Sequence, residues 1–589
     1  MNLRLFLNKT DEITAELSLE NLKDFIHEIA RTLPEGKRDY FIETLKEFQN
    51  SSKKKKIQKS KDEKEHINLL KNIKEVKKKL TEINDGGRVL DSTYNEEWDD
   101  WYNSDADEVL FMDEQGIIKD IESAINLIHS CIDTETYKEG SELAELLSVL
   151  EISVEGDYSD FGNSTLCLYE LWEHHLISYD FQKFVKECLY LTYMGNTLND
   201  RADELFCMMG NFECYSIKLE EILQLGTTEL PDINEFLIQW ISYLGAEKGI
   251  HVDELLKEAQ SMLGDKDVIL ENARKYVVEH PALYEQILCM GADFGNDEKM
   301  FAIGMEALEK IPVSYVIRSN IALLSAEYAI KQKNYHEAEK CWLEAFRSDT
   351  SVVNYLRLRC KANDWNVWEA EVKSIYEQVY NITKMKNQSY GYAKTTNREN
   401  TLYDKQYCVL LFLDEQFDRV MKIGMNERSA LGWSSTFMKE GLALFLLLLW
   451  EGTRLPLGLN EMLKRAISAC KFEVESYVKG TQETGSENNQ EVFWELFCEW
   501  KKTVRISEDE KQKWFNQIDA WIACRVKGIM ENNHRGYYWE CAAFIAAFGE
   551  VQESLGIINA KNNIMQQYKS MYSRRTAFHR ELRAYGMNI

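Results

Sequence analysis

The sequence predicts an all-α protein, arranged as a right-handed α-solenoid of irregular helix hairpins. Apolar residues make up 44% of the 589 residues, which is enough for a continuous core. Only five prolines occur, and this favours long helices because proline breaks the helical hydrogen-bond ladder. A helical-hairpin pattern appears twice between Tyr284 and Thr350. Repeats of this length are typical of helix pairs stacked side by side.

The two copies of the repeated hairpin share one helix face. One constant shift aligns three residues of each copy: Met300, Gly304 and Ala307 with Ala338, Trp342 and Ala345. Positions i, i+4 and i+7 form a single stripe along a helix. We therefore expect these residues to pack hairpins against one another, which leaves other side chains to bind a partner.

Four segments are predicted along the chain. Residues 1–50 form an N-terminal helical hairpin, and residues 51–110 form a charged linker with an exposed helix, basic first and then acidic. The helix in this linker begins near Asp62, and its apolar seam is Leu69, Leu70, Ile73, Val76 and Leu80. Residues 111–400 and 401–589 are two helical repeat regions, since strand signals in them are few and isolated.

Turn residues divide the repeat regions into helices. The turns most relevant to the repeats are Gly264-Asp265, Gly295-Asn296 and Lys333-Asn334. The most apolar run, Leu442–Trp450, is about half the length of a membrane span, so we interpret it as a buried helix. The polar stretch Gly480–Gln490 is interpreted as a flexible connection.

The second copy of the hairpin closely resembles a tetratricopeptide repeat. The matching residues are Ala326, Tyr335, Ala338, Trp342, Ala345 and Asp349. The resemblance implies that the small residues let two helices approach and that the aromatic residue fills the gap to the next repeat. The family's tryptophan in the first helix is missing, and Thr350 replaces its usual proline. The resemblance covers about 70 residues, so the expected array is tetratricopeptide-like and not a strict repeat.

A second resemblance involves the end of the chain. His534-Arg535-Gly536-Tyr537 and Tyr572–Leu582 are similar to the helical portion of bacterial proteins of unclear function that carry a SWIM-type zinc motif. The zinc motif needs a close Cys-x-Cys pair with a spaced histidine and cysteine. This cluster is missing from the sequence, so no metal function is implied.

Charge and cysteine usage exclude several classes of protein. A net charge of −28 argues against a general nucleic-acid binder, whose binding surface is basic. The thirteen cysteines are dispersed without a Cys-x-x-Cys pair, which favours a reducing compartment. We find no secretory signal in the first residues. The chain is therefore expected to be cytoplasmic and to make no contact with a membrane. The sequence does not predict its oligomeric state.

Catalytic, metal and cofactor motifs are not found. Zinc would need four clustered Cys or His ligands, whereas Cys207 with Cys214, and His174 beside His175, offer only pairs. Phosphate-cradling loops, nucleophile elbows and His-Glu-x-x-His motifs are also missing. We therefore predict no catalytic residue, no metal and no cofactor. A Ser–His or Cys–His site assembled from distant residues remains open.

Two groups of residues are predicted to touch a partner. The first is a lysine run of Lys53, Lys54, Lys55 and Lys56, which continues to Lys64. The second is an aromatic cluster in an acidic setting: Trp98, Trp101 and Tyr102. The alternative for the lysines is a solvated arm that contacts the acids of Asp91–Glu108 within the same molecule. The alternative for the aromatic residues is a place in the core, which is usual for aromatic residues at helical spacing.

These observations favour a non-catalytic adaptor or scaffold of a bacterial cytoplasm that holds a protein or peptide partner. The alternative is an accessory subunit of a bacterial nucleic-acid-targeting or defence complex, in which the Lys53–Lys64 arm or a partner touches phosphates. A third possibility is a hydrolase with an unrecognised site. A fold analogy is weak support for a function, so the choice depends on the site.

Overall fold

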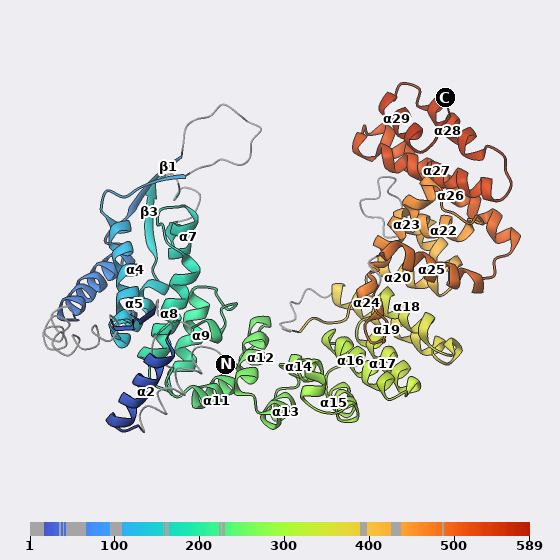
Figure 1. Ribbon diagram of the computed structural model, residues 1–589. Helices are drawn as coiled ribbons and strands as arrows, with labels where there is room; N and C mark the ends of the chain where they lie inside the picture. Colours follow the sequence, from blue (N-terminus) through green and yellow to red (C-terminus); the bar gives the residue numbers. More distant parts are fainter. Residues whose placement is uncertain are drawn as a thin grey trace. The chain divides into compact units, whose positions relative to one another are not determined.

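The computed structural model describes residues 17–33, 37–38, 41–42, 66–94, 109–156, 158, 164–222, 225–226, 230–388, 397–425, 438–485 and 488–588. Helices dominate these residues, which confirms the all-α class (Figure 1). The packing contacts separate two compact units, Met1–Phe236 and Leu237–Ile589. The finer division into four segments and the solenoid arrangement stay predictions.

The first unit contains helices and one small sheet. One helix covers residues 66–84. The other elements are α2 (Leu19–Thr32), β1 (Leu90–Tyr94), β2 (Val109–Met112), α4 (Ile117–Asp133), α5 (Tyr137–Ser148), β3 (Ile152–Gly156), β4 (Thr165–Leu166), α7 (Leu168–Glu173), α8 (Phe181–Gly195), α9 (Arg201–Asn211), α10 (Leu219–Ile222) and the first residues of α11 (Ile233–Leu244).

The helix over 66–84 packs into the first unit through its apolar seam. Leu69, Ile73, Val76 and Leu80 are buried, and Leu70 is half-buried. The helix is therefore exposed mainly on its charged face. Two of its lysines pair with the next helices, because Lys77 contacts Glu142 on α5 and Lys79 contacts Asp120 on α4. These ion pairs and the seam hold this part of the charged segment against the body of the unit.

A four-stranded sheet is the feature that the sequence analysis did not predict. Its strand order is β2-β1-β3-β4, with β1 antiparallel to β2, β1 parallel to β3, and β3 antiparallel to β4. Ser92 on β1 donates its hydroxyl to the carbonyl of Glu155 on β3 at 2.6 Å. The strands are short, and polar residues occupy the middle of β1. Neither property gives the alternating pattern from which strands are predicted.

The second unit is built from consecutive helices. Its first part contains α12 (Ile250–Leu263), α13 (Lys266–Lys275), α14 (Ala282–Met290), η2 (Gly291–Asp293), α15 (Asp297–Lys310), α16 (Ile317–Lys331), α17 (Tyr335–Ser348), α18 (Val352–Lys361), η3 (Trp365–Val367) and α19 (Glu369–Gln388). Its second part contains α20 (Asp404–Leu413), α21 (Phe417–Met425), α22 (Met438–Leu449), α23 (Leu457–Cys470), α24 (Val474–Val478), α25 (Asn489–Thr503), α26 (Glu508–Glu531), η4 (Arg535–Tyr537), α27 (Tyr538–Ser554), α28 (Ala560–Met571) and α29 (Thr576–Ala584).

The predicted turns are confirmed by helix caps. Gly264 ends α12 in the left-handed conformation at φ 71°, and Asp265 caps α13 by accepting backbone N–H groups. Asn296 caps α15, and Asn334 caps α17 in the same way. The apolar run from Leu442 onward is confirmed as a buried helix, α22. These caps set where one helix stops and the next begins, and so they position the site described below.

Candidate functional site

The residues predicted to touch a partner lie outside the described part of the chain. They are Lys53, Lys54, Lys55, Lys56, Trp98, Trp101 and Tyr102. Their role stays a prediction. The described residues that flank them in sequence are Phe41 and Ile42, the packed helix over 66–84, and strands β1 and β2.

The residues predicted to pack the repeats lie in α16 and α17. Ala326, Ala338 and Ala345 are fully buried, and Trp342 is 6% exposed. Tyr335 differs from the prediction because its side chain is 55% exposed. It is the first residue of α17, so it lies at the end of the helix and not in its packed middle.

A distant segment of the chain, residues 474–483, covers part of the α16–α18 face. The indole N–H of Trp342 donates to the carbonyl of Gly480 at 2.8 Å. The N–H of Gly480 donates to Glu327 at 3.1 Å. The buried Arg357 donates to the carbonyl of Tyr477 at 2.9 Å. Helices α16, α17 and α18 therefore bind the main chain of segment 474–483, and this part of their face is already occupied.

Gly480 fits this position because it has no side chain. Its φ of 74° is unfavourable for other residues, and a Cβ there would lie 2.9 Å from the Leu323 side chain and 3.1 Å from the Leu323 backbone. The sequence analysis interpreted Gly480–Gln490 as a flexible connection. The prediction is wrong for Gly480 itself, since both of its main-chain polar groups are bonded to helices α16 and α17.

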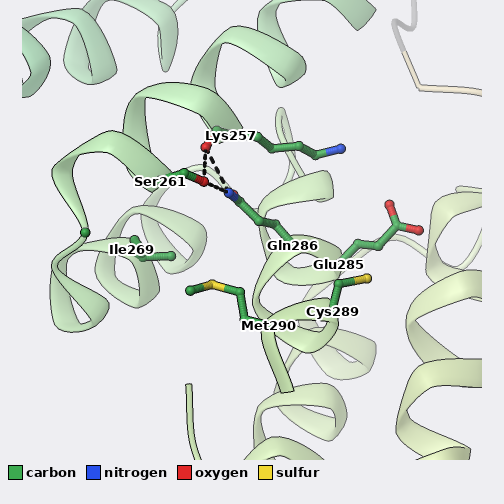
Figure 2. Close-up of a pocket in the computed structure, with 8 residues that line it drawn as sticks. Lys257, Ser261, Ile269, Glu285, Gln286, Cys289 and Met290 are labelled. Atoms are coloured by element: carbon green, nitrogen blue, oxygen red, sulfur yellow. Dashed lines mark hydrogen bonds between the residues drawn. The ribbon is translucent and has the colours of Figure 1, made fainter. Parts of the chain in front are cut away.

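An open cavity of about 450 Å³ lies where α12, α13 and α14 meet (Figure 2). Its lining residues are Lys257, Ser261, Gly264, Ile269, Glu285, Gln286, Cys289 and Met290. The sharp turn at Gly264 separates the end of α12 from the start of α13, and α14 packs across both. Ile269 and Met290 supply apolar wall, whereas the α12 side is polar. The cavity thus has one apolar and one polar side.

The polar side is organised by Gln286. Its amide nitrogen donates to the carbonyl of Lys257 and to the hydroxyl of Ser261, both at 2.9 Å, as the dashed lines in Figure 2 show. The Ser261 hydroxyl donates to the same Lys257 carbonyl at 2.8 Å. The amide oxygen of Gln286 is buried and has no hydrogen-bond partner within the described part of the chain. A buried acceptor without a donor is costly, and it marks a strained point behind the polar side of the cavity.

The charged and sulfur groups of the cavity do not form a reactive centre. Lys257 pairs with Glu254 at 3.1 Å, and Glu285 accepts from Asn320 at 3.0 Å. Burial raises the pKa of the Cys289 thiol, with a further contribution from Glu285, so the reactive thiolate is disfavoured at neutral pH. The cavity is suited to binding a group that carries a polar atom beside an aliphatic side chain.

An Asp–His pair lies near the same helices. His280 Nδ1 is 2.6 Å from Asp253 Oδ1, an arrangement found in hydrolytic triads. Within the described residues, however, His280 Nε2 is buried without a partner, and the residue is only 1% exposed. A Ser or Cys nucleophile at hydrogen-bond distance would be needed for this chemistry. The pair is therefore explained by its role in anchoring the start of α14 to α12.

Possible metal ligands do not gather in the described part of the chain. Among those residues, no group of three or more His, Cys, Asp or Glu side chains is placed to hold an ion. Of the cysteine pair considered above, Cys207 is exposed on α9, whereas Cys214 is buried and follows the end of that helix beyond Asn211. The helices of the described ranges also lack the combination of length and apolar character that a membrane crossing requires.

Sequence reasoning did not find Ser261 and Gln286. Their neighbourhoods have the pattern of ordinary amphipathic helices, and only the predicted Gly264-Asp265 turn marks the place. Comparison with known proteins adds no family: neither models of protein families nor curated proteins match this chain.

Proposed function

We propose that the chain is a non-catalytic protein-binding adaptor on a right-handed tetratricopeptide-like solenoid, and that it acts in a bacterial cytoplasm. The observation that carries this proposal is the open α12–α14 cavity, which has an apolar wall of Ile269 and Met290 beside a polar side organised by Gln286. A peptide presents both features that such a site selects, because each residue carries a main-chain N–H next to a side chain.

The occupied face of α16–α18 supports the same location. The segment 474–483 uses the polar groups of Trp342, Glu327 and Arg357, so these groups are not available to a partner. The α12–α14 cavity is open and holds no other segment of the described chain. We therefore assign the partner to this cavity and expect it to bind as a short extended or helical segment.

Site-specific photo-cross-linking tests the proposal. A photoreactive amino acid placed at Met290 in the full chain is expected to yield one discrete polypeptide adduct in a cell extract. An excess of the unmodified chain should suppress this adduct. The matched control is Val313, which is 47% exposed and does not line the cavity. Identical adducts from both positions would contradict a specific site.

The alternative nucleic-acid role depends on the Lys53–Lys64 arm. Those lysines lie outside the described residues, so the described part of the chain offers no observation on this role. The hydrolase alternative, with an unrecognised site, stays a prediction; at the Asp253–His280 pair the described part of the chain places no nucleophile at hydrogen-bond distance from Nε2. Protein binding is therefore the function that we propose.

A further inference from the structure

A second, larger groove lies in the C-terminal part of the second unit. It has a volume of about 710 Å³ and is bounded by α26, the end of α27 and α28. Its apolar lining residues are Phe515, Phe548, Leu555, Ile557, Ile564 and Met571. Ile557 is 53% exposed and Met571 is 60% exposed, so both leave apolar surface in contact with water. Aliphatic surface of this kind at a groove is typical of a protein-binding site.

Carboxamide side chains supply much of the polar surface of the groove. They are Gln512, Asn516, Gln552 and Gln567. Gln512 donates to Asn516 at 3.2 Å, whereas Gln552 and Gln567 make no side-chain hydrogen bond within the described part of the chain. A carboxamide both donates and accepts, and it therefore matches the N–H and C=O groups of a peptide main chain.

The groove also carries an uncompensated negative charge. Asp519 is an exposed lining residue; partial burial raises the pKa of its carboxyl group, and no cation of the described chain contacts it. One lysine of the groove is paired with acids, because Lys511 lies 3.2 Å from Glu451 and 3.1 Å from Glu508. Lys527, another lining residue, lies 3.9 Å from Glu531.

Helix α27 adds to this negative potential. It ends at Ser554, and its last turn, including Gln552, borders the groove. The C-terminal end of a helix carries a partial negative charge that favours cations. Asp519 and the end of α27 belong to separate elements, so two independent features favour a positively charged ligand.

We propose that this groove is a docking site for a peptide segment of a partner protein that carries a lysine or arginine beside an aliphatic residue. The basic side chain would pair with Asp519, the aliphatic side chain would cover Met571, and the carboxamides would bind the main chain. A second copy of this chain is a poor occupant, because its net charge of −28 adds repulsion. This groove is separate from the α12–α14 cavity, so the inference goes beyond the proposed function.

Fluorescence anisotropy with a defined probe tests the inference. The probe is an amphipathic leucine–lysine peptide of about four helical turns, and the charge control is its leucine–glutamate counterpart. We expect the full chain to bind the lysine peptide and not the glutamate peptide. Asp519→Asn should weaken binding by about three- to fivefold, the effect of losing one ion pair at a group that water still reaches. Asp509→Asn, on the same helix but outside the groove, removes the same charge and should change binding by less than about twofold.

A second pair of variants tests the apolar contact. Met571→Asp should weaken binding although it adds a negative charge, whereas Ile382→Asp, at a residue that is 52% exposed on α19, should not. Equal effects of the two Asp→Asn variants would show general attraction to an acidic protein and overturn the inference. A concentration-dependent dimer that Met571→Asp abolishes, with peptide binding unchanged, would also overturn it. Neither outcome involves Met290, so the proposed function would be unaffected.

Discussion

Replacing Trp342 by phenylalanine should release the segment 474–483 from the α16–α18 face. The change removes the indole N–H that donates to Gly480 at 2.8 Å. A buried carbonyl left without a donor costs about 1–3 kcal/mol. The smaller ring loses roughly 40 Å² of apolar contact, or about 1 kcal/mol at roughly 25 cal/mol per Å². The free energy of opening this segment should therefore fall by about 2–4 kcal/mol.

Hydrogen exchange followed by mass spectrometry measures this opening directly. Each 1.4 kcal/mol corresponds to about a tenfold change, so exchange of the amides in the segment should accelerate by about 30- to 1000-fold. Global unfolding is a poorer assay, because a chain with two compact units need not unfold in a single step. The segment-specific readout separates local release from general destabilisation.

Tyr335→Phe is the matched control for this experiment. It lies on the same helix and is 55% exposed, so its effect on stability should stay within about 0.5 kcal/mol. The reasoning is refuted if exchange of 474–483 in Trp342→Phe rises by less than about threefold. An equal rise throughout α25 and α26 would also refute it, because the hydrogen bond would then not be specific to this segment.

Three further predictions concern packing, pH and charge. Gly304→Val should destabilise the second unit by about 1–3 kcal/mol in denaturant unfolding, because a Cβ at Gly304 would lie 2.1 Å from the Ser325 hydroxyl; adding Ser325→Gly should recover part of the loss, and no recovery would mean that this contact is not the cause. The hydrogen bond from Arg274 to Glu306 lowers the pKa of Glu306 from 4.5 to about 2, so its stabilisation is present above pH 4.5 and is lost as the pH falls toward 2. The difference in thermal midpoint between wild type and Glu306→Gln should therefore shrink over that range, and a constant difference would contradict the assignment. Finally, the acidic chain should not retard duplex DNA or RNA in a gel even at low salt; a salt-sensitive shift that is lost when Lys53–Lys56 are changed to glutamine would establish the nucleic-acid alternative instead.

Local features of the fold could be predicted from sequence because they depend on near neighbours. Periodicity identified the seam Leu69 to Leu80, and cap residues identified the turns at Gly264-Asp265 and Lys333-Asn334. The buried Ala338 and Ala345 of α17 followed from the repeated stripe, and Ala326 of α16 followed from the tetratricopeptide resemblance. Each of these signals lies within one helix or one turn, where spacing alone decides which residues share a face.

The features that could not be predicted depend on residues far apart in sequence. The parallel pairing of β1 with β3 joins two short strands across α4 and α5. The contact between Trp342 and Gly480 joins residues 138 positions apart. The candidate cavity likewise forms only when α14 packs across the α12–α13 turn and brings Gln286 into contact with α12. The spacing of residues along the sequence does not predict contacts between distant segments.

The most direct test of the adaptor assignment is the dissociation constant of the polypeptide cross-linked from Met290. The purified partner would be titrated against the wild-type full chain, Met290→Arg and Val313→Arg. The account predicts that Met290→Arg, which places a charge against the apolar wall of the cavity, weakens binding by at least about tenfold. Val313→Arg, at an exposed residue outside the cavity, should stay within about twofold. Equal affinities for all three proteins would contradict the account.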